Sequence, residues 1–236
     1  MPHRAVITGA SRGLGLALAR ALAAAGWDLV LDARGERELR AAAAELGQST
    51  TVHAVPGDVA DEAHRLDVAA AVDALGGDLD VLVHNASLLG PSPQPSVAEY
   101  PLTELERVYA ANVFGPLRLT QLLLPCMSAG ARIISITSDA AVEPYEGWGG
   151  YGSSKAALEQ WTRVLAAERP GLRVYVVDPG DMRTQMHQDA FPDEDISDRP
   201  PPETSVPGLL TVIEGDLPSG RYEARTLVPA GVGAAS

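Results

Sequence analysis

The sequence predicts an α/β fold, in which a doubly wound and mostly parallel sheet carries helices on both faces. Short apolar runs recur through the first three quarters of the chain and alternate with segments of helical spacing. The runs are nearly continuous, which is typical of strands buried on both faces. The 236 residues are enough for one sizeable hydrophobic core, so we expect a single domain over residues 1–236.

Strands are predicted wherever an apolar run is bounded by turn residues. The run at residues 51–55 is less hydrophobic than the others, which places it near an edge of the sheet. We also expect a final strand beyond Thr226. The remaining runs cover residues 5–7, 29–31, 81–83, 133–136 and 174–177.

Helices are predicted between these strands from the spacing of their apolar residues. Two sets repeat at i, i+4 and i+8: Leu14, Leu18 and Leu22, and Leu158, Thr162 and Ala166.

A longer helix is predicted from just after Pro101 to Met127. Thr103 and Glu106 have the spacing of a capping box at its start. Pro116 lies inside this helix and lacks a backbone donor, so we expect a kink or local break close to Asn112.

Composition and charge exclude several classes of function. Hydrophobic residues make up 46% and charged residues 21%, which is typical of a soluble globular protein. The net charge of −13 repels nucleic acid and anionic membranes. The single cysteine excludes a disulfide framework, and the five histidines show no metal-ligand spacing. We therefore expect a cytoplasmic protein with no metal, no nucleic-acid partner and no membrane segment.

Residues 181–207 break the strand–helix pattern, being rich in Asp, Pro, Ser and Glu. A stretch of this length is too long to be an idle turn, so we predict a mobile substrate lid. A polar surface excursion is the alternative.

A glycine-rich turn follows the first strand and opens the first helix. Gly9 permits a tight turn, Gly13 lets the backbone approach a pyrophosphate, and Gly15 lets helix and strand pack closely. The N–H groups at the helix start then face an anion. The turn therefore predicts a dinucleotide site that includes Gly9, Ser11, Arg12, Gly13, Leu14 and Gly15.

The end of the second strand indicates which dinucleotide binds. Asp32 would hydrogen-bond the ribose hydroxyls of NAD, whereas Arg34 would accept the 2′-phosphate of NADP. The two-residue period of a strand puts both on one face. Arg12 can converge on the same phosphate, so we predict NADP(H), preferred over NAD(H). The alternative is that Arg34 is only the solvated start of the next helix.

Tyr151 and Lys155 begin a predicted helix at i, i+4 spacing, which puts both side chains on one face. Tyrosine ordinarily ionises near pH ~10, and an adjacent ammonium would lower its pKa. The pair is therefore a candidate for acid–base chemistry. By chance, such a pair is more often a lysine lying beside a ring.

The glycine turn, the Tyr-x-x-x-Lys pair and their order along the chain resemble the single-domain branch of the short-chain dehydrogenase/reductase family. The resemblance covers essentially the whole chain and implies a Rossmann-type fold. It implies that Ser138, thirteen residues before Tyr151, and Asn112 are catalytic together with Tyr151 and Lys155. It also assigns cofactor contacts to Asp58, Val59, Asn85, Ala86, Tyr151, Lys155, Pro179, Gly180 and Thr184.

One departure from the family pattern follows the fourth strand. His84-Asn85-Ala86-Ser87 stands where the family usually has Asn-Asn-Ala-Gly. We expect His84 to alter a supporting hydrogen bond rather than to act as a catalytic base.

The resemblance implies hydride transfer between NADPH and the carbonyl or imine carbon of a small molecule, with Tyr151 as general acid. An NADP(H)-binding sensor without turnover is the alternative, and an epimerase or dehydratase is less favoured because of the glycine spacing. A homodimer or homotetramer would pair through Leu119, Leu122 and Leu123, which could instead face the sheet.

A substrate pocket is expected beyond the carboxyl ends of the strands. Three loops should form it, at residues 87–97, 139–150 and 181–199. These loops offer several apolar side chains, each of which could instead pack its own loop: Tyr145, Trp148, Met182, Met186 and Phe191.

Overall fold

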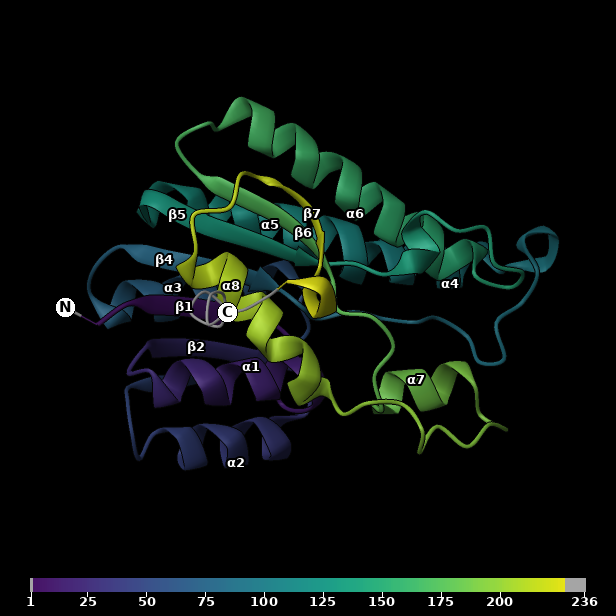
Figure 1. Cartoon of the computed structure of the whole chain (residues 1–236), viewed down its shortest axis with the longest axis horizontal. Helices are drawn as coiled ribbons and strands as arrows, with labels where there is room; N and C mark the ends of the chain where they lie inside the picture. Colours follow the sequence, from purple (N-terminus) through teal and green to yellow (C-terminus); the bar gives the residue numbers. More distant parts are fainter. Residues whose placement is uncertain (1, 228–236) are drawn as a thin grey trace, which may run out of the picture.

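A parallel sheet forms the centre of the protein, which we describe from a computed structural model covering residues 2–227. Seven strands lie in the order β3-β2-β1-β4-β5-β6-β7, and every neighbouring pair is parallel (Figure 1). The strands are β1 (Arg4–Ile7), β2 (Asp28–Ala33), β3 (Val52–Pro56), β4 (Leu79–His84), β5 (Met127–Ile136), β6 (Arg173–Asp178) and β7 (Gly220–Glu223).

The six strands that the apolar runs predict are confirmed, and β3 lies at a sheet edge as expected. The seventh strand, β7, lies before Thr226 rather than beyond it. Leu227 is not in a strand, and the rest of the expected final strand falls on residues 228–236, outside the described part of the chain.

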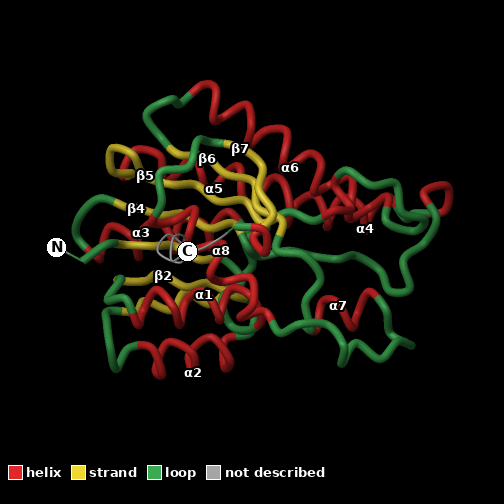
Figure 2. Tube along the Cα trace, viewed as in Figure 1, coloured by secondary structure: helices red, strands yellow, loops and turns green. Residues whose placement is uncertain are grey.

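Helices cover both faces of the sheet, so the sheet lies between two helical layers (Figures 1 and 2). This arrangement confirms the doubly wound α/β fold. One buried apolar cluster packs α1, α2 and α8 on one face, and a second packs α3, α5 and α6 on the other. The helices on the two faces are α1 (Gly13–Ala24), α2 (Glu36–Leu46) and α8 (Val206–Glu214), and α3 (Glu62–Leu75), α5 (Gly115–Leu123) and α6 (Gly149–Glu168).

The long helix expected after Pro101 is broken in the middle. Helix α4 (Leu102–Tyr109) runs into a π-helical turn at Ala110–Phe114, and α5 then starts at Gly115. The expected irregularity near Asn112 is therefore confirmed. The capping box is wrong, because Pro101 is the N-cap and no side chain caps the first turn.

The predicted end of this helix at Met127 is also wrong. Helix α5 ends at Leu123, and a 3₁₀ turn at Leu124–Cys126 leads into β5. Pro125 lies in that turn and has no backbone N–H to continue the helical bonding.

Two of the leucines considered for subunit pairing, Leu119 and Leu123, are each 1% exposed. They pack in the apolar cluster between the sheet and helices α3, α5 and α6. They therefore belong to the core of this chain, and pairing of subunits stays a prediction. Within residues 2–227, no helix is both long and apolar enough to cross a membrane.

Residues 181–207 contain more regular structure than their composition indicates. Helix α7 (Gln185–Ala190) and a 3₁₀ turn at Pro202–Ser205 interrupt the loop. The segment with α7 lies beyond the carboxyl ends of the strands, away from both helical layers (Figure 1). This position places α7 over the edge of the sheet where ligands bind in folds of this class.

Candidate active site

A cleft of about 1170 Å³ opens at the carboxyl ends of the strands. Its walls come from the glycine-rich turn, the segments that follow β2, β3, β4, β5 and β6, the start of α6 and the α7 segment. Of the predicted site residues, all except Gly15 and Asn112 line this cleft. Residues that are far apart in the sequence are thus brought to one place by the parallel topology.

The glycine-rich turn is bonded to the segment after β4. The Thr8 hydroxyl donates to Val83 O and accepts the N–H groups of Asn85 and Ala86, each at 3.0 Å. The Asn85 amide donates to Thr8 O at 2.8 Å and to Gly9 O at 3.1 Å. Asn85 therefore holds the shape of the turn.

Two glycines of the turn have no room for a side chain. A Cβ at Gly9, where φ is +66°, would lie 2.8 Å from Ala86 Cα. A Cβ at Gly15 would lie 2.6 Å from Gly9 O and 2.5 Å from the Asn85 amide nitrogen. Gly15 does not line the cleft; its lack of a side chain lets α1 pack closely against the turn and against Asn85.

The start of α1 has the features of an anion site. Arg12 is the N-cap residue and provides no side-chain hydrogen bond to the first turn. A Cβ at Gly13 would meet only Thr184 Cγ2, at 3.6 Å across the cleft. Backbone N–H groups at a helix start that lack a side-chain cap bind phosphate well. The turn thus fits the pyrophosphate of a dinucleotide.

Asp32 does not face the cleft as a free acceptor. It is fully buried, its Oδ1 accepts the Gly9 N–H at 2.8 Å, and its Oδ2 lies 3.2 Å from His64 Nε2. Burial raises the pKa of the Asp32 carboxyl, and the hydrogen bonds from His64 and Gly9 offset only part of this effect. Asp32 and Arg34 both line the cleft, but each carboxylate oxygen of Asp32 already has a partner, so Asp32 is not a free acceptor for a ribose.

Arg34 lies just past the end of β2, where it is exposed at the rim of the cleft. Arg12 lines the same cleft from the glycine-rich turn. Within residues 2–227, neither guanidinium forms an ion pair with a carboxylate. Two unpaired cations therefore stand at the end of the cleft where Arg34 is expected to meet a phosphate.

Tyr151 and Lys155 lie on α6 and are both buried, at 7% and 2% exposure. Lys155 Nζ donates to Ile136 O at 2.8 Å and lies 5.5 Å from the centre of the Tyr151 ring. Burial raises the pKa of Tyr151 to about 12 and lowers that of Lys155 to about 8. The expected lowering of the tyrosine pKa is therefore wrong for this arrangement, in which loss of solvation is the largest effect on both groups.

Ser138 follows β5 and lines the cleft. It caps the 3₁₀ turn Asp139–Ala141, accepting the Ala140 N–H at 3.2 Å, and its hydroxyl donates to Asp139 Oδ1 at 2.8 Å. Asp139 also accepts the Tyr145 hydroxyl at 3.0 Å. These bonds fix the position of the serine oxygen on the cleft wall.

Asn112 lies behind the cleft wall, in the π-helical turn, and is fully buried. Its Oδ1 accepts the Leu88 N–H at 2.7 Å, and its Nδ2 donates to Leu88 O and to the Ser154 hydroxyl, both at 2.9 Å. Asn112 therefore connects the segment after β4 to α6, and it does not touch the cleft itself.

His84 has the supporting role expected of it. It is 2% exposed, and its Nε2 lies 2.7 Å from the Thr120 hydroxyl. Burial, followed by the charge of Lys155, lowers the pKa of His84 to about 3. His84 does not line the cleft, and an imidazole with so low a pKa is a weak proton acceptor.

The expected apolar side chains gather at the substrate end of the cleft. The Trp148 ring lies 5.7 Å from that of Tyr151 and 5.8 Å from that of Phe191. Met186 on α7 packs against the same small cluster. Tyr145 and Met182 line the cleft as well.

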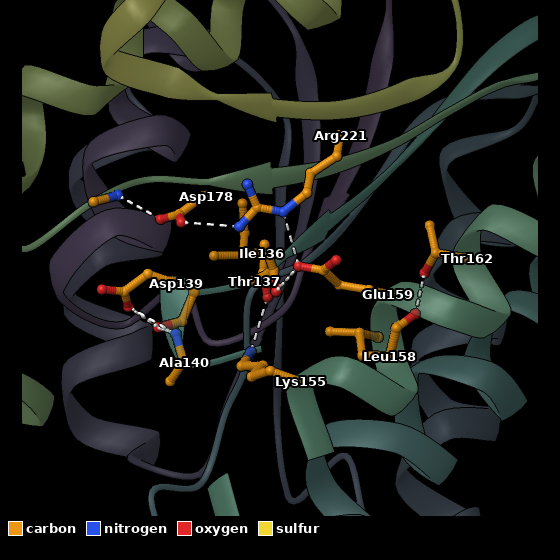
Figure 3. A network of polar contacts seen from close by, with 12 residues as sticks. Ile136, Thr137, Asp139, Ala140, Lys155, Leu158, Glu159, Thr162, Asp178 and Arg221 are labelled. Carbon is orange, nitrogen blue, oxygen red and sulfur yellow. Dashed lines mark hydrogen bonds and ion pairs between the residues drawn. The ribbon is translucent and has the colours of Figure 1, made fainter. Parts of the chain in front are cut away.

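Glu159 and Arg221 are two polar residues near the site that sequence reasoning missed (Figure 3). Glu159 stands at i+4 from Lys155, a signal that could have identified it. Arg221 has no such signal, because it lies on the strand that the apolar runs did not predict. Among the described residues, no group of three His, Cys, Asp or Glu side chains could hold a metal ion.

Known proteins are similar to this chain in sequence and in fold. The family model for short chain dehydrogenase matches residues 3–195. Benzil reductase ((S)-benzoin forming) of Saccharomyces cerevisiae is 33% identical over 193 residues, covering 78% of this chain and 73% of that protein.

Solved structures agree over nearly the whole length. A short chain dehydrogenase from Salmonella enterica superposes with a TM-score of 0.88 at 30% identity, covering 95% of this chain and 96% of that one. An alcohol dehydrogenase from Thermococcus sibiricus, complexed with 5-hydroxy-NADP, gives 0.85 at 28% identity, covering 94% and 96%. This chain therefore belongs to the short-chain dehydrogenase/reductase family of oxidoreductases.

Proposed function

We propose that this protein reduces the carbonyl group of a small molecule with NADPH, and that Tyr151 donates the proton. The observation that carries the proposal is the meeting of Ser138, Tyr151 and Lys155 on one wall of a cleft whose other wall is the glycine-rich turn. A sensor that only binds the nucleotide has no chemical need for a buried phenol and ammonium beside a hydroxyl.

The nicotinamide cofactor supplies the hydride when it is bound. Ser138 would hydrogen-bond the substrate carbonyl and hold it within reach of Tyr151. A raised pKa keeps the Tyr151 phenol protonated near neutral pH, so it has a proton to donate to the developing alkoxide. Lys155 would bind the nicotinamide ribose and, as an ammonium, stabilise the phenolate that remains.

The other contacts of the proposed cofactor follow from the cleft wall. The N–H groups of Gly13 and Leu14 and the side chain of Ser11 would hold the pyrophosphate, and Asp58 and Val59 the adenine. Pro179, Gly180 and Thr184 would hold the nicotinamide end. The complex of the Thermococcus sibiricus enzyme with 5-hydroxy-NADP supports a cofactor of this class.

The aromatic wall of Trp148 and Phe191 favours a substrate with a flat or apolar group beside its carbonyl. The relative that forms (S)-benzoin acts on such a compound. Aryl ketones and diketones therefore belong in the first panel of substrates.

The proposed proton donor is tested with Tyr151→Phe. We expect NADPH consumption with the carbonyl panel to fall by about a hundredfold or more, because the proton donor is gone. The Kd for NADPH, measured by nicotinamide fluorescence, should change little, since most cofactor contacts lie elsewhere. Unchanged turnover in Tyr151→Phe would refute the role of the phenol, and no turnover in the wild type would favour the sensor.

The proposed preference for NADP(H) is tested with Arg34→Ala. We expect the Kd for NADPH to rise by about tenfold or more while the Kd for NADH changes little, because only NADPH carries the phosphate that Arg34 would bind. Arg37→Ala is a matched control, since Arg37 is 92% exposed, pairs with Glu38 and does not line the cleft. Equal weakening of both cofactors would contradict the assignment.

A further inference from the structure

A buried set of charged side chains connects β7 to α6 (Figure 3). Arg221 on β7 donates from Nε to Glu159 Oε1 at 3.1 Å and from Nη2 to Asp178 Oδ2 at 3.2 Å. Thr137 donates from its hydroxyl to the same Glu159 oxygen at 2.7 Å. The side chains of Glu159 and Asp178 are only 5% and 11% exposed. Two carboxylates buried this deeply need the guanidinium between them.

Each end of this network reaches the wall of the cleft. Asp178 Oδ1 accepts the Gly180 N–H at 2.8 Å and so holds the turn at which Gly180 takes a φ of +70°. At the other end, Thr137 stands between Ser138 and Ile136, whose carbonyl accepts Lys155 Nζ. Arg221 is therefore connected to the turn after β6 through Asp178, and to the end of β5 through Glu159.

We propose that Arg221 and Glu159 are positioning residues for the reduction: Arg221 fixes the turn after β6 relative to α6, and Glu159 supplies the negative charge that keeps Lys155 an ammonium. This inference rests on the proposed function, because the two residues would act through Lys155 and through the turn after β6, which the proposed function assigns to the cofactor site. Neither Arg221 nor Glu159 touches the reacting atoms; Glu159 is not part of the cleft wall.

Few groups around Lys155 stabilise its charged, ammonium form. Lys155 is 2% exposed, and its one hydrogen-bond partner among the described residues is the neutral Ile136 carbonyl. Burial lowers its pKa, and Glu159 raises it in part. Glu159 lies one helical turn further along α6. Its carboxylate pairs with Arg221 rather than with Lys155, so it acts on the ammonium as a nearby negative charge, whose loss would make the ammonium less stable.

The other titratable groups around Lys155 do not replace this charge. Tyr151 on the same helix is a neutral phenol near pH 7, and His84 on β4 is a neutral imidazole. Asp139 after β5 and Asp178 at the end of β6 act on Tyr151, whose pKa they raise. Arg221 from β7 is already paired with two carboxylates.

The first arm of the test uses Glu159→Gln, which retains the size and an acceptor oxygen for Thr137 and Arg221 but removes the charge. Lys155 has a pKa of about 8, so carbonyl reduction by the wild type should decline above that pH. In Glu159→Gln the decline should move to lower pH by about one unit. The pH dependence of NADPH binding should move in the same direction, because Lys155 would also bind the cofactor.

The second arm uses Arg221→Met and Arg221→Lys. We expect Arg221→Met to raise the KM for NADPH and to lower kcat by about tenfold, because a shift of the turn after β6 would misplace the bound cofactor relative to the substrate. Arg221→Lys should recover part of both, since it keeps a cation between Glu159 and Asp178. Arg173→Met is the matched control: Arg173 lies on the adjacent strand β6 and pairs with Asp216 at an exposed site, outside the cleft.

Coincident pH profiles of Glu159→Gln and the wild type would overturn the role of Glu159. Equal losses in Arg221→Met and Arg173→Met, or no recovery in Arg221→Lys, would overturn that of Arg221. If the wild type binds NADPH but reduces no carbonyl, the proposed function fails, whereas the pH dependence of NADPH binding still tests Glu159. If Glu159→Gln does not fold, the Arg221 variants test the network on their own.

Discussion

At the scale of single residues, the cleft depends on polar groups that are buried just beneath its surface. Asp32 accepts the N–H of Gly9 and contacts His64 on α3, so it joins the glycine-rich turn to a helix on the opposite face of the sheet. Glu159 performs a similar task between β5 and β7. Asp32 thus holds the backbone of the glycine-rich turn, whereas Glu159 holds the side chains of Thr137 and Arg221.

The structural role of Asp32 leads to a stability prediction. Asp32→Ala leaves the Gly9 N–H and His64 without their partner in a buried site, so we expect the free energy of unfolding to fall by about 3 kcal/mol. For a chain of this size, that corresponds to a Tm lower by about 6–12 °C in thermal denaturation.

Asp32→Asn is the matched variant, since its side-chain oxygen can still accept the Gly9 N–H, and it should lose less stability than Asp32→Ala. A Tm of Asp32→Ala equal to that of the wild type would show that this carboxylate does not support the turn.

Residues differ in how far the sequence could predict them. Gly9, Gly13, Tyr151 and Lys155 lie in short local patterns, and the order of these patterns along the chain indicates their chemistry. His64 and Arg221 act through contacts between elements far apart in the chain, and no local spacing reports such contacts. For Asp32, the period of a strand gives the face of the side chain but not its partners, Gly9 and His64.

At the scale of elements, the α7 segment is weakly attached to the rest of the fold. Helix α7 has six residues, none of them fully buried, and it packs on the cleft through Met186 and Ala190. Thr184 caps it by accepting the His187 N–H at 3.3 Å. Few buried contacts give a segment low local stability, as a substrate lid requires.

We propose that residues 181–207 close over the bound cofactor and substrate, and hydrogen exchange tests this. Amide exchange in α7 should become slower when NADPH is added, because the filled cleft gives Met186 and Ala190 a surface to pack against. Of α2, only Glu38 in the first turn lines the cleft, so exchange in the rest of this helix should be nearly unchanged. Equal exchange in α7 with and without NADPH would contradict the lid.

Elements were predictable where one strong local signal existed. Pro116 indicated the irregularity that appears as the π-helical turn, and the apolar runs indicated six strands. Strand β7 has the sequence Gly-Arg-Tyr-Glu and lies at a sheet edge, half-exposed, so it presents no apolar run. Its pairing with β6 decides its conformation.

At the scale of the whole molecule, the parallel order of the strands builds the cleft. The carboxyl ends of β1, β2, β4, β5 and β6 meet at one edge, and each is followed by a segment that carries a proposed site residue. The net charge of −13 would repel an anionic cofactor, so the unpaired Arg12 and Arg34 matter for its capture.

We propose that a hydride passes from a nicotinamide to a carbonyl carbon held beside Tyr151. The most direct test supplies NADPH deuterated at the transferable position of its nicotinamide, with an aryl ketone, and analyses the product by mass spectrometry. We predict an alcohol that carries one deuterium on its former carbonyl carbon in the wild type, and almost none in Tyr151→Phe. An alcohol without deuterium, or equal labelled product from both proteins, would contradict the account.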